Sequence, residues 1–112
     1  MSAPISIAVL GATGNLGRQV CRQALDRGWR LSVGVRNRGR LDPETAARAR
    51  IADLDLVAAT VGQLASFLSG QDVFVFSAGV VTQGEAFVRL FDKAVSAVEA
   101  LPASSRPVSW FL

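Results

Sequence analysis

The sequence has neither histidine nor tyrosine, and it has one cysteine and one lysine among its 112 residues. Without histidine, the chain can build neither a Ser-His-Asp triad nor a Cys/His zinc site. Without tyrosine it has no phenolic general acid, and Cys21 alone cannot form an internal disulfide. These absences exclude several common kinds of hydrolytic and metal-dependent site.

The chain also has only a small excess of positive charge. Eleven arginines and one lysine against nine acidic residues give a net charge of +3, and the densest basic run, residues 36–40, is a patch and not a stripe. No stretch approaches the ~20 apolar residues of a membrane span, and Met1–Ser6 carries none of the positive charge of a secretory signal. We expect no nucleic-acid partner, no membrane partner and a cytoplasmic protein.

Half of the residues are hydrophobic, and they are grouped in a regular alternation. Apolar, β-branched runs predict strands over residues 5–10, 31–35, 51–54, 73–76 and 106–112. Three- and four-residue apolar spacing predicts helices over residues 15–27, 57–68 and 87–101, and an N-cap signal predicts a short helix over residues 42–49. Strands that are continuously apolar are typical of a parallel sheet covered on both faces. The sequence therefore predicts one α/β domain, a doubly wound parallel sheet of about five strands.

Residues at the ends of the expected helices support these boundaries. Gly28 and Gly70 follow the first and third helices, where glycine commonly takes the left-handed conformation that ends a helix. Asp42 precedes Pro43 and Glu44, a combination typical of an N-cap followed by the first helical turn.

Three glycines stand between the first expected strand and the first expected helix, in the motif GATGNLG of residues 11–17. One glycine allows a tight turn, one lets backbone N–H groups approach a pyrophosphate, and one lets the helix pack closely. The free N–H groups and the dipole of the helix then favour the negative charge. The motif predicts a Rossmann-like dinucleotide-binding loop; the alternative is a tight turn that binds nothing.

Arginine occupies the position that commonly selects between the two nicotinamide cofactors. Arg36 lies 22 residues after Gly14, where NAD-binding proteins carry an acidic residue that binds the ribose. A guanidinium cannot accept a hydrogen bond from a ribose hydroxyl, but its planar fork can bind a 2′-phosphate. We therefore expect NADP(H) in preference to NAD, with Arg36 as the first candidate and Arg38 as the second.

Over residues 5–112, the chain resembles the extended or atypical short-chain dehydrogenases/reductases. It is most similar to their NAD(P)H-binding group, which includes NmrA-like, flavin- or biliverdin-reductase-like and epimerase-dehydratase proteins. Four segments carry the resemblance: GATGNLG, the VRNR segment after the second strand, Asp53-Leu54 after the third, and Ser77-Ala78-Gly79 after the fourth.

The resemblance implies a role for each matching position. The residues that would wrap the pyrophosphate are Gly11, Thr13, Gly14, Asn15, Leu16 and Gly17. Arg36 would hold the adenosine phosphate, and the pair Asp53 and Leu54 would lie near the adenine. Ser77, Ala78 and Gly79 would lie against the ribose of the cofactor. Asp53 has a structural alternative, because it could instead cap the helix that follows.

Two departures from the family concern catalysis. The Tyr-x-x-x-Lys pair that many members use to protonate a carbonyl cannot exist here, and Lys93 lies in mid-helix at a spacing that fits no such motif. The family would also continue beyond the fifth strand into a substrate-binding half. We therefore expect residues 1–112 to be an NAD(P)-binding Rossmann domain, truncated at strand five, whose last strand could pair with a second copy in a homodimer.

Three functions remain open on the sequence. The first is an NADPH-dependent reductase that acts on a flavin, a carbonyl compound or a similar acceptor. The second is a non-catalytic, NADP-sensing protein of the NmrA-like type. The third is an inactive remnant. The sequence identifies no catalytic residue and no substrate, and it predicts no metal.

Overall fold

The computed structural model describes residues 4–12, 14–55, 58–76, 84–107 and 109–111, and of residues 84–88 and 109–111 the backbone alone. Five parallel strands form one sheet in the order β3-β2-β1-β4-β5. The strands are β1 (Ser6–Leu10), β2 (Arg30–Val35), β3 (Arg50–Asp53), β4 (Val73–Phe76) and β5 (Ser109–Phe111). The doubly wound α/β fold predicted from the sequence is confirmed.

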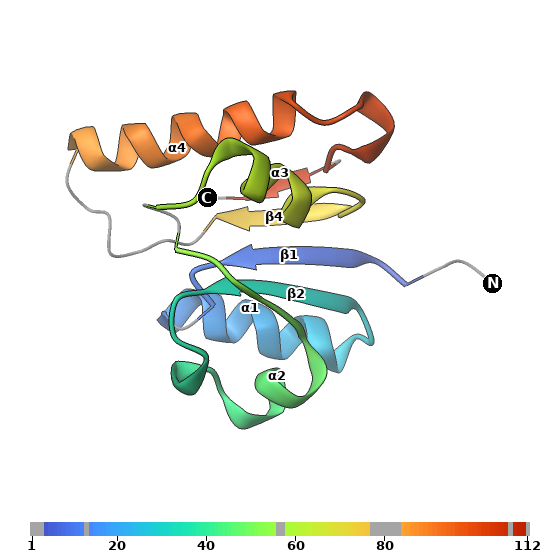
Figure 1. Cartoon of the computed structure of the whole chain (residues 1–112). Coiled ribbons are helices and arrows are strands. Elements are labelled where there is room, and N and C mark those ends of the chain that lie inside the picture. The colour runs from blue at the N-terminus through green and yellow to red at the C-terminus, as the bar shows by residue number, and fades with distance from the viewer. Residues whose placement is uncertain (1–3, 13, 56–57, 77–83, 108, 112) are drawn as a thin grey trace.

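Helices connect successive strands and cover both faces of the sheet. They are α1 (Asn15–Asp26), α2 (Pro43–Arg48), α3 (Val61–Leu68) and α4 (Gly84–Glu99). Figure 1 shows α3 and α4 together in the upper part of the view, and α1 and α2 together in the lower part. Among the described residues, no helix is both long and apolar enough to cross a lipid bilayer.

The sheet separates two hydrophobic cores, because successive side chains of a strand point to opposite faces. Ala8 and Leu10 of β1 face the core that contains residues of α3 and α4. Ile7 and Val9 of the same strand face the core that contains Cys21 and its neighbours in α1. This two-sided burial explains why the strands are continuously apolar in sequence.

The third helix begins later than the sequence predicts. The expected helix spans 57–68, whereas α3 begins at Val61, and the described residues 58–60 before it are not helical. The reason is a capping box: the Thr60 hydroxyl accepts the amide N–H of Gln63 at 3.1 Å, and the Gln63 side chain accepts the amide N–H of Thr60 at 2.9 Å. The spacing of Thr and Gln predicts this start, but apolar periodicity alone does not.

Asp42 occupies the N-cap position of α2, as expected, but its side chain does not cap the helix. The carboxylate instead contacts two guanidinium groups of α1, at 3.8 Å from Arg18 Nε and 3.5 Å from Arg22 Nη2. The Asp42 side chain therefore links α1 to the start of α2, while only the Asp42 backbone carbonyl accepts an amide of its own helix, that of Ala46 at 2.9 Å.

The fifth strand is shorter than the expected 106–112. Ala103–Ser105 form a 3₁₀ turn, and the side chain of Arg106 turns back toward the end of α4. Its Nε donates to the Leu101 carbonyl at 2.9 Å, and its Nη2 donates to the Glu99 carbonyl at 3.0 Å. Basic side chains commonly satisfy the free carbonyls at a helix C-terminus. Arg106 therefore belongs to the end of α4 and not to the strand.

Candidate functional site: the carboxyl edge of the sheet

The strand order of the sheet reverses beside β1. The chain moves from β1 toward β2 and β3 on one side, and then to β4 and β5 on the other. Ligands of doubly wound sheets bind outside the carboxyl ends of the strands, where the strand order reverses in this way. The GATGNLG loop leaves β1 at this point and leads directly into α1.

The first and last glycines of the loop are required by its backbone. Gly11 has a φ of +89°, in the left-handed region that a side chain would disfavour, and its carbonyl accepts the Gly14 amide at 3.1 Å. A Cβ atom on Gly17 would collide with the Gly11 carbonyl oxygen and lie 2.7 Å from its carbonyl carbon. Gly17 therefore allows α1 to pack directly against the loop, as its position in the motif predicts.

The first turn of α1 is open to an anion. Gly14 is its N-cap residue, no side chain caps the helix there, and its first turn has no acidic residue. The first amide N–H groups of a helix have no partner within the helix. Asn15 and Leu16, which follow, are exposed, and Leu16 is 58% accessible. Backbone N–H groups and an exposed apolar side chain thus lie together at this helix end.

Arg36 and Arg38 follow the end of β2, and both are exposed. Within the described part of the chain, the Arg36 guanidinium has no hydrogen-bond or ion-pair partner. Arg38 instead forms a two-point ion pair with Asp53, its Nε lying 2.7 Å from Oδ1 and its Nη2 lying 3.0 Å from Oδ2. The two arginines therefore differ in what they can offer a ligand.

Asp53 ends β3, next to β2 at the carboxyl edge of the sheet. Asp53 does not cap the following helix. Its carboxylate pairs with Arg38, and the N-cap residue of α3 is Thr60. The hydrogen bond from Arg38, together with the positive charge, lowers the pKa of the Asp53 carboxyl below its usual value. The same hydrogen bond raises the pKa of Arg38. Both groups remain charged at neutral pH.

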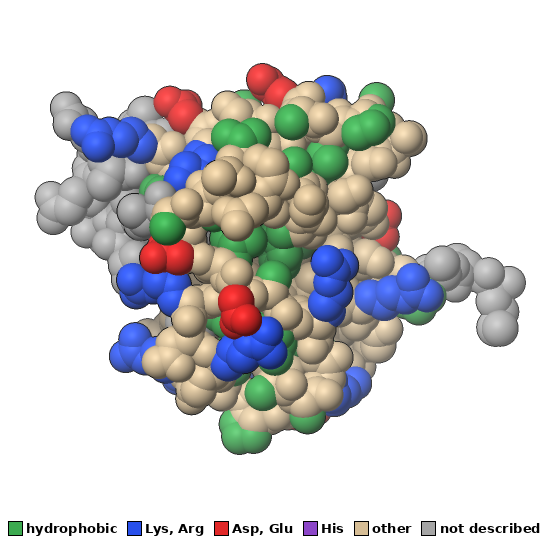
Figure 2. All heavy atoms as spheres, in the orientation of Figure 1, with side chains coloured by type: hydrophobic (Ala, Val, Ile, Leu, Met, Phe, Trp, Pro, Cys, Tyr) green, Lys and Arg blue, Asp and Glu red, His purple; other side chains and the backbone are tan. Residues whose placement is uncertain are grey.

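Leu54 is buried in the core beneath α3, and its amide donates to the Val35 carbonyl at 2.9 Å. It also lines a recess of about 460 Å³ that runs along the outer edge of β3 and includes Asp53, Ala59 and Phe67. Figure 2 shows hydrophobic side chains at the floor of a hollow between the two groups of helices. The structure thus brings the motif loop, Arg36 and the Asp53-Leu54 pair to one edge of the sheet.

Thr13, Ser77, Ala78 and Gly79, which the sequence also predicts to contact a cofactor, lie outside the described residues. Of the described residues, no group of three or more His, Cys, Asp or Glu side chains could hold a metal ion. Cys21 is not a nucleophile, because burial, with a smaller contribution from Asp42, raises the pKa of its thiol to about 12.

Comparison with known proteins agrees with this geometry. The sequence profile of the NAD(P)H-binding family matches residues 11–105. A Rossmann-fold NAD(P)-binding family protein from Shigella flexneri superposes with a TM-score of 0.72 over 88% of this chain, at 19% identity. A nucleoside-diphosphate-sugar epimerase from Staphylococcus aureus superposes with a TM-score of 0.71 over 85% of this chain, at 22% identity. These two likenesses establish the fold.

The matches cover this chain more fully than they cover the relatives. The chain spans 47% of the Shigella protein and 34% of the Staphylococcus protein. A stretch of 33 residues, 30% of this chain, is 58% identical to the Photosystem II assembly factor Ycf39 of Guillardia theta and covers 10% of that protein. The family profile, in contrast, extends over most of this chain and includes the motif loop, so the chain belongs to the NAD(P)H-binding family.

Proposed function

We propose that the chain binds NADP(H), with the pyrophosphate at the start of α1 and the 2′-phosphate of the adenosine at Arg36. The single observation that carries the choice of NADP(H) is the unpartnered guanidinium of Arg36 at the end of β2. An acidic residue in this position would favour NAD, because it would accept a hydrogen bond from the ribose and repel a phosphate.

Gly14 supports the position of the pyrophosphate. Among the described residues, a Cβ atom on Gly14 would meet only the Gly11 carbonyl oxygen, at an ordinary contact distance of 3.6 Å. Its φ of −80° is also accessible to any residue. Neither its backbone conformation nor its packing against the described residues therefore requires glycine here. A ligand that approaches the backbone closely does require it.

The two arginines divide the work at the adenosine end. Arg36 is free to form a fork of hydrogen bonds with a phosphate. Arg38 lies two residues away and neutralises Asp53, so that this carboxylate does not repel the phosphate from the site. We assign the direct phosphate contact to Arg36 and the neutralising contact to Arg38.

The activity that we propose is that of an oxidoreductase. The bound cofactor would supply hydride transfer from its nicotinamide, and the protein would position it against a flavin, a carbonyl compound or a similar acceptor. An oxidoreductase from Lactococcus lactis and the Staphylococcus epimerase share this fold. The second candidate is an NADP-binding sensor without catalysis, which the absence of any histidine or tyrosine favours.

Calorimetric titration with NADPH and NADH tests the proposed cofactor. We expect NADPH to bind more tightly, and the substitution Arg36→Asp to reverse this preference. Arg27→Asp is the control, because Arg27 is also exposed but follows the C-terminal end of α1, away from the GATGNLG loop. An unchanged ratio of the two affinities in Arg36→Asp would refute the role of Arg36.

The two candidate functions differ in turnover. A reductase would oxidise NADPH when a flavin or carbonyl acceptor is added, whereas a sensor would bind NADPH and leave it reduced. Absorbance of the reduced nicotinamide, followed over time with and without the acceptor, separates them. If neither NADPH nor NADH binds the folded protein, both candidate functions are ruled out.

A further inference from the structure

A second cavity lies at the amino edge of the sheet, where the parallel strands begin, and therefore opposite the GATGNLG loop. It has a volume of about 540 Å³ and is lined by the first residues of three neighbouring strands, Ser6 of β1, Arg30 of β2 and Arg50 of β3. A cavity of this size can hold a small organic ligand.

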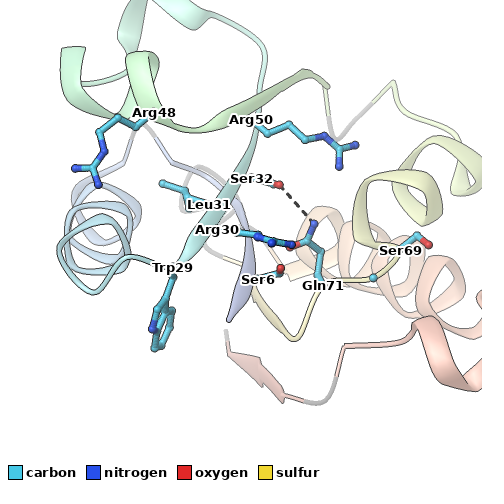
Figure 3. A pocket seen from close by; sticks show the side chains of 10 residues that line it. Ser6, Trp29, Arg30, Leu31, Ser32, Arg48, Arg50, Ser69 and Gln71 are labelled. Carbon is cyan, nitrogen blue, oxygen red and sulfur yellow. Dashed lines mark hydrogen bonds between the residues drawn. The ribbon is translucent and has the colours of Figure 1, made fainter. Parts of the chain in front are cut away.

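The strand register brings two arginines together around Ser32. Arg30 and Ser32 are two residues apart on β2, so their side chains point to the same face of the sheet. Arg50 is the register partner of Ser32 on β3. In Figure 3 the side chains of Arg30 and Arg50 extend on the same side of β2 as Ser32 and Gln71.

The charge around this cavity is positive and only partly balanced. Within the described part of the chain, the guanidinium groups of Arg30 and Arg50 have no hydrogen-bond or ion-pair partner. The third lining arginine, Arg48, contacts Glu44 at 2.7 Å. The described residues that line the cavity include no acidic one. The nearby Asp72 carboxylate accepts the Ser6 amide at 2.8 Å and is not part of the lining.

Gln71 gives an independent indication of a ligand. It lies between α3 and β4, is only 7% accessible and lines the cavity. Its Nε2 donates to the Ser32 hydroxyl at 3.4 Å, whereas its Oε1 has no hydrogen-bond partner among the residues that the structure describes. A buried carbonyl oxygen without a donor is costly and uncommon in folded proteins. A ligand that carries a hydroxyl or N–H group would satisfy it.

We propose that the amino edge holds an anion-binding site, separate from the cofactor site, in which Arg30 and Arg50 bind an anionic group and Gln71 Oε1 accepts a hydrogen bond from the same ligand. The ligand class is a small phosphate ester or carboxylate that also carries a hydroxyl or amide group. Arginine forks match both anionic groups. This site does not depend on the proposed binding of NADP(H).

Titrations followed by NMR test the site, with the amide signals of Ser32, Arg50 and the Gln71 side chain as reporters. The probes are glycerol 3-phosphate, D-glycerate and sulfate, which carries no O–H group at neutral pH. We expect saturable shifts of these signals with at least one of the two hydroxyl-bearing probes, and weaker binding of sulfate. The comparison between glycerol 3-phosphate and glycerate shows which anionic group the site prefers.

Three variants separate the parts of the proposal. Arg30→Gln and Arg50→Gln should each weaken binding of the hydroxyl-bearing probe by about tenfold, the usual order for the loss of one charge-assisted contact. Gln71→Met removes the unpartnered oxygen and keeps the length of the side chain. It should weaken binding of the hydroxyl-bearing probe several-fold and leave binding of sulfate unchanged. Arg40→Gln is the control, because Arg40 is exposed and follows β2 at the opposite edge of the sheet; it should change nothing at these reporters.

Two results would overturn the proposal. One is the absence of saturable shifts at Ser32, Arg50 and Gln71 with all three probes in a protein whose spectrum shows that it is folded. The other is an adventitious ion only: equal binding of all three probes that neither Gln71→Met nor the two arginine variants alter. Because NADPH is absent from these titrations, neither result bears on the cofactor site.

Discussion

Arg38 and Asp53 are joined by two hydrogen bonds, of 2.7 and 3.0 Å, across the carboxyl ends of β2 and β3. Two-point pairs of this kind fix the orientation of both groups more strongly than a single contact does. The guanidinium and the carboxylate are both exposed, so salt screens their attraction and the pair adds little to stability. Its importance is for the site, because it occupies one of the two arginines that the sequence offers for a 2′-phosphate.

Removal of the Asp53 charge should strengthen NADPH binding. In Asp53→Asn, Arg38 loses its ionic partner and adds its positive charge to that of Arg36. We expect the affinity for NADPH to rise about threefold at low salt and the affinity for NADH to change little, since surface charges at this range contribute modestly. Calorimetric titration of both cofactors measures the change.

Asp26→Asn is the control for this prediction, because Asp26 ends α1, away from the carboxyl edge, and is also exposed. Weaker binding of both NADPH and NADH by Asp53→Asn would contradict the prediction. It would show that the carboxylate contacts a part of the cofactor that the two share, as the family resemblance implies for the adenine.

Gly17→Ala should destabilise the fold. The added methyl group would overlap the Gly11 carbonyl and force α1 away from the loop, at a cost of about 2 kcal/mol, in the range for an overpacked site. Urea unfolding measures the loss. Gly62→Ala in α3 is the matched control, because its Cβ would lie 3.8 Å from the Thr60 hydroxyl.

The control should behave in the opposite way. Alanine in a helix is more favourable than glycine by up to about 1 kcal/mol, so Gly62→Ala should unfold at the same or a higher urea concentration. Equal destabilisation by the two substitutions would show that the contact between Gly17 and Gly11 is not the cause.

Loss of the capping box should weaken α3. Thr60→Ala removes the hydroxyl that accepts the Gln63 amide, and the loss of such a cap typically costs about 1 kcal/mol. Thr60→Ser keeps the hydroxyl and should restore most of the stability. The free energy of unfolding of the three proteins gives the comparison; a Thr60→Ala protein as stable as the parent would be inconsistent with the box.

Cys21 should make stability fall at alkaline pH. Its pKa is raised to about 12 in the folded protein, whereas an unfolded thiol ionises near pH 8.5. Between these values the folded state binds the proton that the unfolded state has released. The free energy of unfolding should therefore decrease as the pH rises through this interval, by at most about 1.4 kcal/mol per pH unit.

Cys21→Ala lacks the thiol and should lose this slope, although the small cavity that it leaves lowers its stability at neutral pH. Urea unfolding at a series of pH values, with both proteins, separates the constant loss from the slope. Parallel curves for the two proteins would mean that Cys21 does not remain protonated in the folded state.

The strands and the motif loop were predictable because their signals are local. Residues 73–76 form a short apolar run between turn residues, and the observed β4 has these same bounds. Gly28 and Gly70 were expected to end helices, and their φ values of +73° and +76° confirm it. In each case the physical requirement concerns a few neighbouring residues, so the sequence displays it directly.

Contacts between distant segments were harder to predict from the sequence. Asp42 was expected to cap α2, but its carboxylate instead lies near Arg18 and Arg22 of α1. Arg38 and Asp53 are 15 residues apart, and nothing local indicates that they form a pair. The arginines of the amino-edge cavity are visible in the sequence, since they begin two adjacent strands. That the Gln71 oxygen is buried without a donor among the described residues follows only from the packing.

The two cores on opposite faces of the sheet have an energetic consequence. Val9 and Leu10 are neighbours in the chain, yet each packs in a different core, and the backbone of β1 stands between them. Substitutions that enlarge a void on one face leave the packing partners on the other face in place, so their costs should simply add. Side chains of α1 on one face, and of α3 and α4 on the other, can therefore vary in composition largely independently. The strands between them keep the same hydrogen-bonded pairing.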